Sequence, residues 1–375
     1  MASPLPKEPA MFARPCTTAR TLTFAGLIAA GSVLSTSSHA ALFCATTGDQ
    51  LASALATADS NGADDEIRVS IGTKTRSSLS DGLTRWSYVE AGTDVTKALI
   101  LTGGWDSSCT LRFPSPPTFL DAQLGGPALD IRLGTNSQAS VQVSGFDILR
   151  GYTADSFAFS GFRLQSTGIN SPLIVIDRVR VRNSGSDGDN TAIVALELRT
   201  GGLTFRNSQV SQNRSYSAAA VVLSTTGNGQ INFVNNSVID NTDSVPTSAG
   251  PVGGVSAFGS GTLTLYNNLL YDNTSVRSVD LSIENGVGLL SNNHIGILSG
   301  TPDANSGRTS GDPKITFNNS WYPMLAADSL LRDSGSTFVP GGAGSEDIRG
   351  QQRIQGAKID RGAIEFESMF ASGFE

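Results

Sequence analysis

The sequence predicts an all-β solenoid, a parallel β-helix, because one short sequence motif recurs at near-regular intervals. Each copy alternates apolar and polar residues and then closes with asparagine, as in residues 203–207, 231–235 and 263–267. Alternation with a period of two indicates half-buried strands. A repeat of about this length is typical of a solenoid. The corner residues, 28, 32 and 25 positions apart, are Asn207, Asn235, Asn267 and Asn292.

The recurring asparagine predicts the corner at which each coil turns. Asparagine adopts the left-handed backbone conformation of a sharp corner more readily than most side chains do. When coils stack at the ~4.8 Å strand spacing, their corner side chains stack as well and can bond in a ladder. A β-sandwich of short strands is the alternative, but it explains the alternation without the repeated asparagine.

The first 40 residues have the features of a signal peptide. An apolar stretch at 21–34 is too short to span a bilayer, and Ser-His-Ala at 38–40 is a small-x-small cleavage signal. The basic residues before it are Lys7, Arg14 and Arg20. We therefore expect a mature chain from Ala41, with Met1 or Met11 as the start. It should lie outside the cell or on its outer surface, with the periplasm as the alternative, and it has no later segment of transmembrane length.

The composition favours an exported all-β protein. Only 16% of the residues are charged, and the chain holds 41 glycines. The net charge is −7, and loss of three basic residues and one acidic residue with segment 1–40 makes it −9. An acidic chain is not expected to bind nucleic acid or an anionic membrane. The remaining cysteines, Cys44 and Cys109, predict a disulfide, with two buried free thiols as the alternative.

One β-helix domain is expected at 41–365. A helix at 47–60, with Leu51, Leu55 and Ala58 on one face, would close the open end of the core within a cap at 44–72. Further strands are expected at 67–71, 98–101, 128–133, 141–149, 157–164 and 173–181. The other expected parts are regular coils at about 98–300, an irregular region at 301–365 and a tail at 366–375.

Several motifs give the chain a family resemblance over residues 44–365. Asn-Gly-Ala-Asp-Asp-Glu-Ile-Arg-Val at 61–69 and Gly-Gly-Trp-Asp at 103–106 are followed by four C-terminal motifs. Those four are Gly311-Asp312-Pro313, Ser329 to Gly335, Asp347-Ile348-Arg349-Gly350 with Arg353, and Asp360 to Glu365. In this order they resemble exported bacterial right-handed parallel β-helix proteins of the choice-of-anchor-Q type. The resemblance implies a surface or secreted protein with a variable C-terminal anchor and no known reaction. The tail at 369–375 resembles a short sorting tag.

A stripe of arginines is one candidate catalytic site. Lyases of this fold hold Ca²⁺ with clustered carboxylates and use an arginine base. Arg178, Arg180 and Arg182 alternate beside Asp177, so they should share one outer face suited to gripping uronate carboxylates. The alternative is a solvated face neutralised by nearby aspartates, because the sequence shows no carboxylate cluster on the neighbouring coils.

The loop at 184–190 is a weaker candidate, for Ca²⁺. Asp187 and Asp189 supply oxygen ligands, but Leu198 stands where an EF-hand needs glutamate. A Gly-Asp turn is the alternative.

Other enzyme sites find little support. Asn-Thr-Asp at 241–243 resembles one tripeptide of the polygalacturonases, but hydrolysis needs a second carboxylate and the next coil has none. A corner turn is the simpler interpretation of Asp243. His294 is the one histidine of the mature chain, so neither a zinc site nor a Ser-His-Asp triad is expected.

Aromatic side chains offer a candidate sugar platform. Tyr266 and Tyr271 flank one asparagine corner, and Trp321 and Tyr322 lie in the irregular region. Packing under loops is the alternative.

Two functions follow. The first is a non-catalytic, exported or surface-associated β-helix that presents a polar face for adhesion or glycan binding and needs no cofactor. The alternative is a Ca²⁺-dependent polysaccharide lyase, or a hydrolase, acting on an acidic glycan. The expected partner is an extracellular polysaccharide or a cell-surface component. An enzyme needs several charged residues that converge on one outer groove across adjacent coils.

Overall fold

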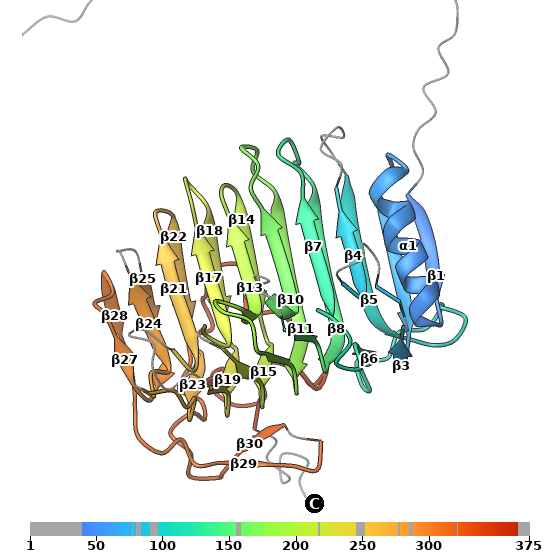
Figure 1. Ribbon diagram of the computed structural model, residues 1–375. Coiled ribbons are helices and arrows are strands. Elements are labelled where there is room, and N and C mark those ends of the chain that lie inside the picture. Colours follow the sequence, from blue (N-terminus) through green and yellow to red (C-terminus); the bar gives the residue numbers. More distant parts are fainter. Residues whose placement is uncertain are drawn as a thin grey trace, which may run out of the picture. The chain divides into compact units, whose positions relative to one another are not determined.

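The structure is a computed structural model. It describes residues 40–366 except 77, 80–83, 91–96, 155–158, 217, 245–251, 277, 285–287 and 321. All of these residues belong to one compact unit, Ser38–Glu375. Its strands stack coil upon coil between the helix α1 (Gly48–Ser60) and the last coil (Figure 1). The chain is thus the right-handed parallel β-helix that the sequence predicts, and the signal segment and the end of the tail lie outside the described residues.

Sheet A runs along the whole stack. Its main path is β1 (Ala41–Ala45), β2 (Asp65–Ser70), β5 (Ala98–Trp105), β8 (Ser140–Leu149), β11 (Leu173–Arg182), β14 (Gly202–Arg206), β18 (Gln230–Val234), β22 (Thr262–Tyr266), β25 (Gly288–Ser291) and β28 (Ala304–Ser306). Beyond the corner, most coils continue in a second arm of the same sheet. The separate strands of this second arm are β3 (Gly72–Thr75), β6 (Thr118–Asp121), β15 (Gln209–Ser211), β19 (Ser237–Ile239), β23 (Leu269–Tyr271) and β26 (His294–Ile295).

Two more parallel sheets complete the coils. Sheet B contains β4 (Trp86–Val89), β7 (Leu129–Leu133), β10 (Phe159–Ser166), β13 (Ala192–Leu198), β17 (Val221–Thr225), β21 (Val255–Gly259), β24 (Leu281–Glu284) and β27 (Leu298–Ser299). Sheet C contains β9 (Tyr152–Thr153), β12 (Gly185–Ser186), β16 (Arg214–Ser215) and β20 (Thr242–Asp243). An antiparallel hairpin, β29 (Ile315–Phe317) with β30 (Pro323–Leu325), lies outside the coils.

The core is a column of like residues in register. Leu203, Ile231 and Leu263 face one another on β14, β18 and β22, and all three are buried. At the next inward position, two residues further along each strand, Phe205 and Phe233 stack. Their ring centroids are 5.5 Å apart and their planes are 7° from parallel. The alternation in sequence therefore places every second side chain in a continuous apolar interior.

The predicted asparagine corner is present, and three of its four members bond to one another. Asn207, Asn235, Asn267 and Asn292 all have positive φ, between 50° and 56°. The Asn235 amide donates to the Asn207 side-chain oxygen at 3.3 Å, and Asn267 donates to Asn235 at 2.9 Å. Asn292 differs, because the backbone of Ser336 occupies the Asn267 side-chain oxygen and Asn292 donates to Ser291 instead.

Two further asparagine stacks lie deeper in the wall. In the first, the backbone N–H of Asn236 donates to the side-chain oxygen of Asn268 at 2.9 Å. The backbone N–H of Asn268 donates in the same way to the side-chain oxygen of Asn293, also at 2.9 Å. The second stack lies at the next corner and contains Asn213, Asn241 and Asn273, and Asp280 completes it. These side chains also donate to inward carbonyls, so they satisfy backbone groups that the turns leave unpaired.

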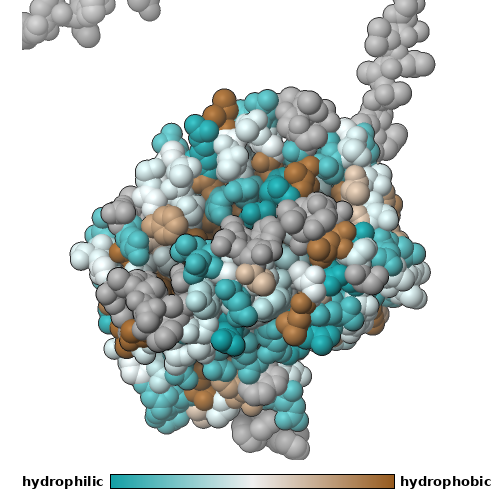
Figure 2. Space-filling model, viewed as in Figure 1, coloured by the Kyte–Doolittle hydropathy of each residue, from teal (hydrophilic) through white to brown (hydrophobic). Residues whose placement is uncertain are grey.

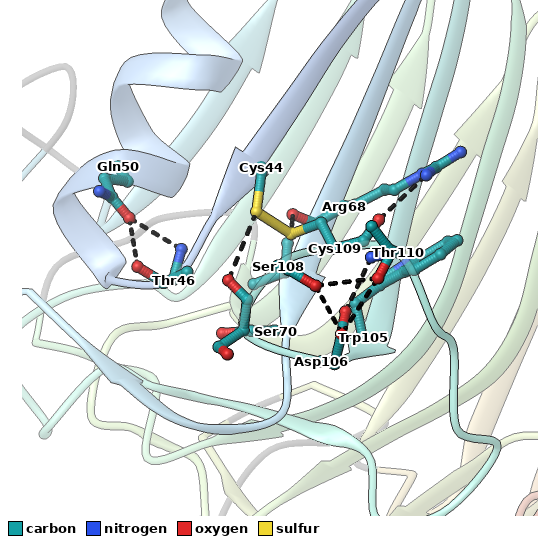
Figure 3. Close-up of a disulfide and its surroundings, with 12 residues drawn as sticks. Cys44, Thr46, Gln50, Arg68, Ser70, Trp105, Asp106, Ser108, Cys109 and Thr110 are labelled. Atoms are coloured by element: carbon teal, nitrogen blue, oxygen red, sulfur yellow. Dashed lines mark hydrogen bonds between the residues drawn. A yellow bond between two sulfur atoms is a disulfide. The ribbon is translucent and has the colours of Figure 1, made fainter.

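The N-terminal cap has the predicted form. Thr47 and Gln50 make a capping box at the start of α1, and Leu51 and Leu55 are buried over the first coils. The disulfide between Cys44 and Cys109 is confirmed, with the two Cα atoms 5.7 Å apart. It ties β1 to the turn after β5 (Figure 3).

That turn is held by Asp106. Its carboxylate accepts from the Ser108 hydroxyl and from the backbone of Thr110 and Leu111, and these bonds lower the pKa of Asp106 to about 2. The Asp106 carboxylate therefore stays ionised, and able to accept these bonds, at ordinary pH.

The C-terminal region is largely irregular, as predicted, but it packs closely against the coils. Residues 307–366, called here the C-terminal cover, fold back over the outer side of the second arm of sheet A. The Ala363 amide donates to the Ser237 hydroxyl at 2.9 Å, and the Ser336 amide donates to Asn267 at 2.8 Å. An apolar cluster joins the two layers and consists of Ile239, Leu269, Leu325 and Leu331.

The cover also crosses the asparagine corner at close range. Gly341 has φ 75°, and a Cβ there would lie 2.1 Å from the Thr204 hydroxyl oxygen. The next residues supply the Ala343 carbonyl, which accepts from Asn207 at 2.8 Å. Only glycine permits this approach at Gly341. The Pro-Gly-Gly-Ala-Gly stretch therefore packs closely on the asparagine corner.

Removing one buried ladder amide should destabilise the solenoid. Asn268→Ala leaves the Phe233 carbonyl and the Asn236 amide without a buried partner. We expect a loss of about 3 kcal/mol or more, because each unpaired buried group costs about 1–3 kcal/mol. Urea unfolding followed by circular dichroism measures the loss. Asn228→Ala, in an exposed turn, is the matched control and should change stability by less than about 0.5 kcal/mol. Equal midpoints for the two variants would contradict this account of the ladder.

Removing the disulfide should loosen the cap. The Cys44→Ser/Cys109→Ser double variant opens a link across 65 residues and should lose about 2–4 kcal/mol. Thermal unfolding of both proteins, with and without reductant, checks this expectation. Reductant should lower the melting temperature of the wild type and leave that of the double variant unchanged. A wild type whose melting point ignores full reduction would show that the cap holds without the bond.

Candidate functional site

The outer face of sheet B carries two rows of side chains at right angles to its strands. The first row, in register from coil to coil, is Ser87, Asp130, Arg163, Ala195, Val222, Ser256 and Ser282. The second row is Val89, Arg132, Gln165, Glu197, Ser224, Phe258 and Glu284. Strand spacing places neighbours in a row ~4.8 Å apart, so an extended ligand can contact several coils. These rows form the candidate site.

Two arginines around one buried carboxylate mark the N-terminal part of these rows. Asp130 is 0% exposed and accepts from Arg163 at 2.7 and 2.9 Å. Arg132 lies 2.9 Å from the same carboxylate. The Arg163 guanidinium also lies 4.6 Å from the Phe159 ring centroid. Asp130 thus holds two guanidinium groups in a fixed geometry, and such groups suit an anionic or strongly polar ligand.

The next coils have a different character. Gln165 donates to the Glu197 carboxylate at 2.7 Å. Beside Glu197, a groove of about 270 Å³ opens over β13, β17 and β21, with Val222 and Ser256 among its lining residues. The face therefore combines a cationic end with a small groove that holds one carboxylate. Hydrophilic side chains predominate over the described part of the view in Figure 2, with apolar ones scattered between them.

Sequence reasoning missed this face. The strands of sheet B lie outside the repeated motif that ends in asparagine, and β13 was not predicted. The signal was present in the paired alternation of Asp130 with Arg132 and of Arg163 with Gln165, two polar outward positions on each strand.

The predicted arginine stripe lies under the C-terminal cover. Arg180 points outward from the solenoid core, yet it is only 3% exposed. Its guanidinium donates to Asp147, one coil away, and to the Ser320 carbonyl, and the Tyr322 ring covers it at 4.3 Å. Arg182 pairs with the same Asp147. Asp147 could not be placed beside the stripe from sequence, because it becomes a neighbour only through the register of β8 with β11.

The other two members of the stripe are engaged as well. Arg178 occupies a corner position with φ 56°, so it does not continue the alternation, and it pairs with Glu346 of the cover. Asp177 pairs with Arg206 at 3.3 Å and accepts from Asn207 at 2.9 Å. The four candidate catalytic residues thus hold the cover and the corner in place rather than line an open groove.

The aromatic candidates are also separated. Tyr266 lies half-buried on the first arm of sheet A, whereas Tyr271 packs edge-on against His294 under the cover. Tyr322 lies on Arg180, and Trp321 falls outside the described residues. They do not form one platform.

The Ca²⁺ candidates Asp187 and Asp189 are exposed in their loop. The Tyr152 hydroxyl donates to Asp187 at 2.8 Å. Within the described ranges, no three histidine, cysteine or acidic residues are grouped so as to hold a metal. Asp243 lies in β20 and is buried.

A polar chain fixes the start of the cover to the last coils. Arg361 donates to the Thr309 hydroxyl at 2.8 Å, and Thr309 lies 3.0 Å from His294 Nδ1. His294 Nε2 lies 3.1 Å from the Gly311 carbonyl, which can only accept, so Nε2 carries the proton and Nδ1 accepts from Thr309. His294 is fully buried, and this burial lowers its pKa.

Two of the four C-terminal sequence motifs, the one at 347–353 and the one at 360–365, meet in one buried cluster. Arg353 lies 3.2 Å from Glu365, and both side chains are almost fully buried. Burial raises the pKa of Glu365 to about 8, against the opposing effect of Arg353. Asp347 accepts from Arg349 at 3.0 Å and from the Glu365 amide at 3.1 Å. The motif residues therefore serve the internal packing of the cover.

Comparison of the chain with protein-family models, with curated proteins and with solved structures gave no match. Across the described residues, no helix has the length and apolar character needed to cross a membrane.

His294 should make stability depend on pH. Above about pH 6.5 the ring is neutral in both the folded and the unfolded chain. Below that pH the unfolded chain binds a proton first, so stability should fall, by at most about 1.4 kcal/mol per pH unit. Urea midpoints measured from pH 8 to pH 5 test this.

His294→Gln is the control for that titration, because its side chain is neutral at every pH. Nearby groups, Arg361, Arg308 and Asp312, remain in both proteins. The difference in stability between wild type and variant should shrink as the pH falls. A constant difference over the whole range would show that His294 titrates normally in the folded protein.

Proposed function

We propose that this chain is an exported or surface-associated, non-catalytic protein that binds glycans along the outer face of sheet B. The supporting observation is the pair of rows of polar outward side chains, from Arg132 and Arg163 to Glu197 and Glu284, set one coil apart. Rigid outward side chains at the ~4.8 Å strand spacing suit an extended polymer, because such a ligand can contact several coils at once.

Export and surface attachment rest on sequence. The signal segment at 1–40 and the resemblance to choice-of-anchor-Q proteins support them. Disulfides form and persist in oxidising compartments, so the bond between Cys44 and Cys109 agrees with an exported chain.

The lyase alternative is less well supported. Its arginine base would have to come from the stripe, and Arg180 is buried between Asp147 and Tyr322. An acidic glycan could reach this group only after the C-terminal cover moved away. The open rows of sheet B need no such movement.

Glycan binding should be lost when the sheet B face is blocked. The full chain would be applied to a panel of bacterial and plant polysaccharides, acidic and neutral, with product release monitored in the same samples with and without Ca²⁺. We expect binding without depolymerisation. Ser224→Arg, a half-buried outward position in the second row, should weaken binding at least about ten-fold by placing a bulky side chain in the path of the ligand.

The matched control is Thr262→Arg, a half-buried outward position on the first arm of sheet A. It should bind as the wild type does. Equal weakening by both substitutions, or no binding to any member of the panel by well-folded protein, would overturn the proposal. Depolymerisation lost in Arg180→Lys would favour the lyase.

A further inference from the structure

The groove on sheet B has an unusual floor for an outward face. Outward positions of a solenoid normally carry polar side chains, since they meet water. Here Ala195 and Val222 occupy successive outward positions of β13 and β17, and Ser256 follows on β21. The floor is therefore apolar over two coils and ends in one hydroxyl.

The two walls differ in chemistry. Ala219 and Val252, from the connections that lead into β17 and β21, belong to the apolar cluster beside Val222 and extend the floor upward. The opposite wall contains Glu197 and Phe258, two coils apart in the second row and thus ~10 Å from each other. Glu197 is the one ionisable side chain among the described residues that line the groove.

The size of the groove limits its ligand. Its volume of about 270 Å³ lies just below the ~300–1,000 Å³ of sites that enclose drug-sized molecules. One sugar unit with a substituent fits this space, and the rest of a polymer would lie along the rows outside it.

Building on the proposed glycan binding, we propose that this groove selects an N-acetylated sugar unit. The acetyl methyl group would pack on the half-buried Val222, beside the buried Ala195, where a hydroxyl would place a polar atom against an apolar floor. The amide N–H would donate to the Glu197 carboxylate, and a charged acceptor makes this a strong bond. The apolar face of the ring would lie on Phe258.

The same chemistry disfavours other units. A uronic acid in the groove would bring its carboxylate to Glu197, and like charges repel. A plain hexose supplies donors for Glu197 but nothing apolar for the floor. An acidic unit is better placed one or two coils away, beside Arg163 on β10 and Arg132 on β7.

The test compares two soluble trisaccharides by titration calorimetry on the full chain. N-acetylglucosamine trisaccharide should bind at least about ten-fold more tightly than the glucose trisaccharide, which has a hydroxyl at the same position. Val222→Asp should weaken binding of the acetylated sugar by about ten-fold or more, and Glu197→Gln, which keeps the shape, should weaken it by several fold.

Val175→Asp is the matched control, because Val175 is a half-buried outward valine on the first arm of sheet A. It should leave binding unchanged and shows whether an outward aspartate by itself disturbs the fold. Equal affinity for the two sugars, or equal effects of the two valine substitutions, would overturn this inference. If other glycans bind and Ser224→Arg blocks them while the acetylated sugar does not bind, the inference fails and the proposed function stands. If no glycan binds, both fail.

Discussion

The structure depends on one constraint, which is that every coil must stack in register on the one before it. Inside, this requirement yields the column of Leu, Ile and Phe. At the corners it brings side-chain amides together, and the buried stacks through Asn268 and Asn241 pair backbone groups that the turns expose. Apolar stacking supplies the free energy, whereas the asparagine stacks fix the register, because a slipped coil would bury unpaired amides.

Stacking also determines which surfaces are open to a ligand. The C-terminal cover packs on the second arm of sheet A. Its Ser320 and Tyr322 contact Arg180 of the arginine stripe, and its Ala343 carbonyl accepts from the corner amide of Asn207. Sheet B carries its own outward rows, in which Asp130 holds two arginines and Glu197 faces an apolar groove. The contrast between the covered second arm of sheet A and the uncovered outer face of sheet B is the basis of the proposed function.

Much of the fold could be predicted from sequence, because each coil of a solenoid has the same physical requirement and the sequence therefore shows the same pattern several times. The alternation in 203–207 and its copies, the helix at 47–60 and the pairing of Cys44 with Cys109 each depend on local pattern or on compartment. The candidate site could not be predicted in the same way. Arg180 looked exposed because the sequence does not show that Ser320 and Tyr322 return to cover it. The cluster of Asp130 with Arg132 and Arg163 arises only from the register of β7 with β10.

The most direct test of the central claim is a crystal structure of the full chain soaked with a polysaccharide fragment that it binds. The account predicts ligand density across the outer face of sheet B, along β13, β17 and β21 and within reach of Glu197 and Arg163. Density on the first arm of sheet A, or beneath a displaced C-terminal cover against Arg180, would contradict it.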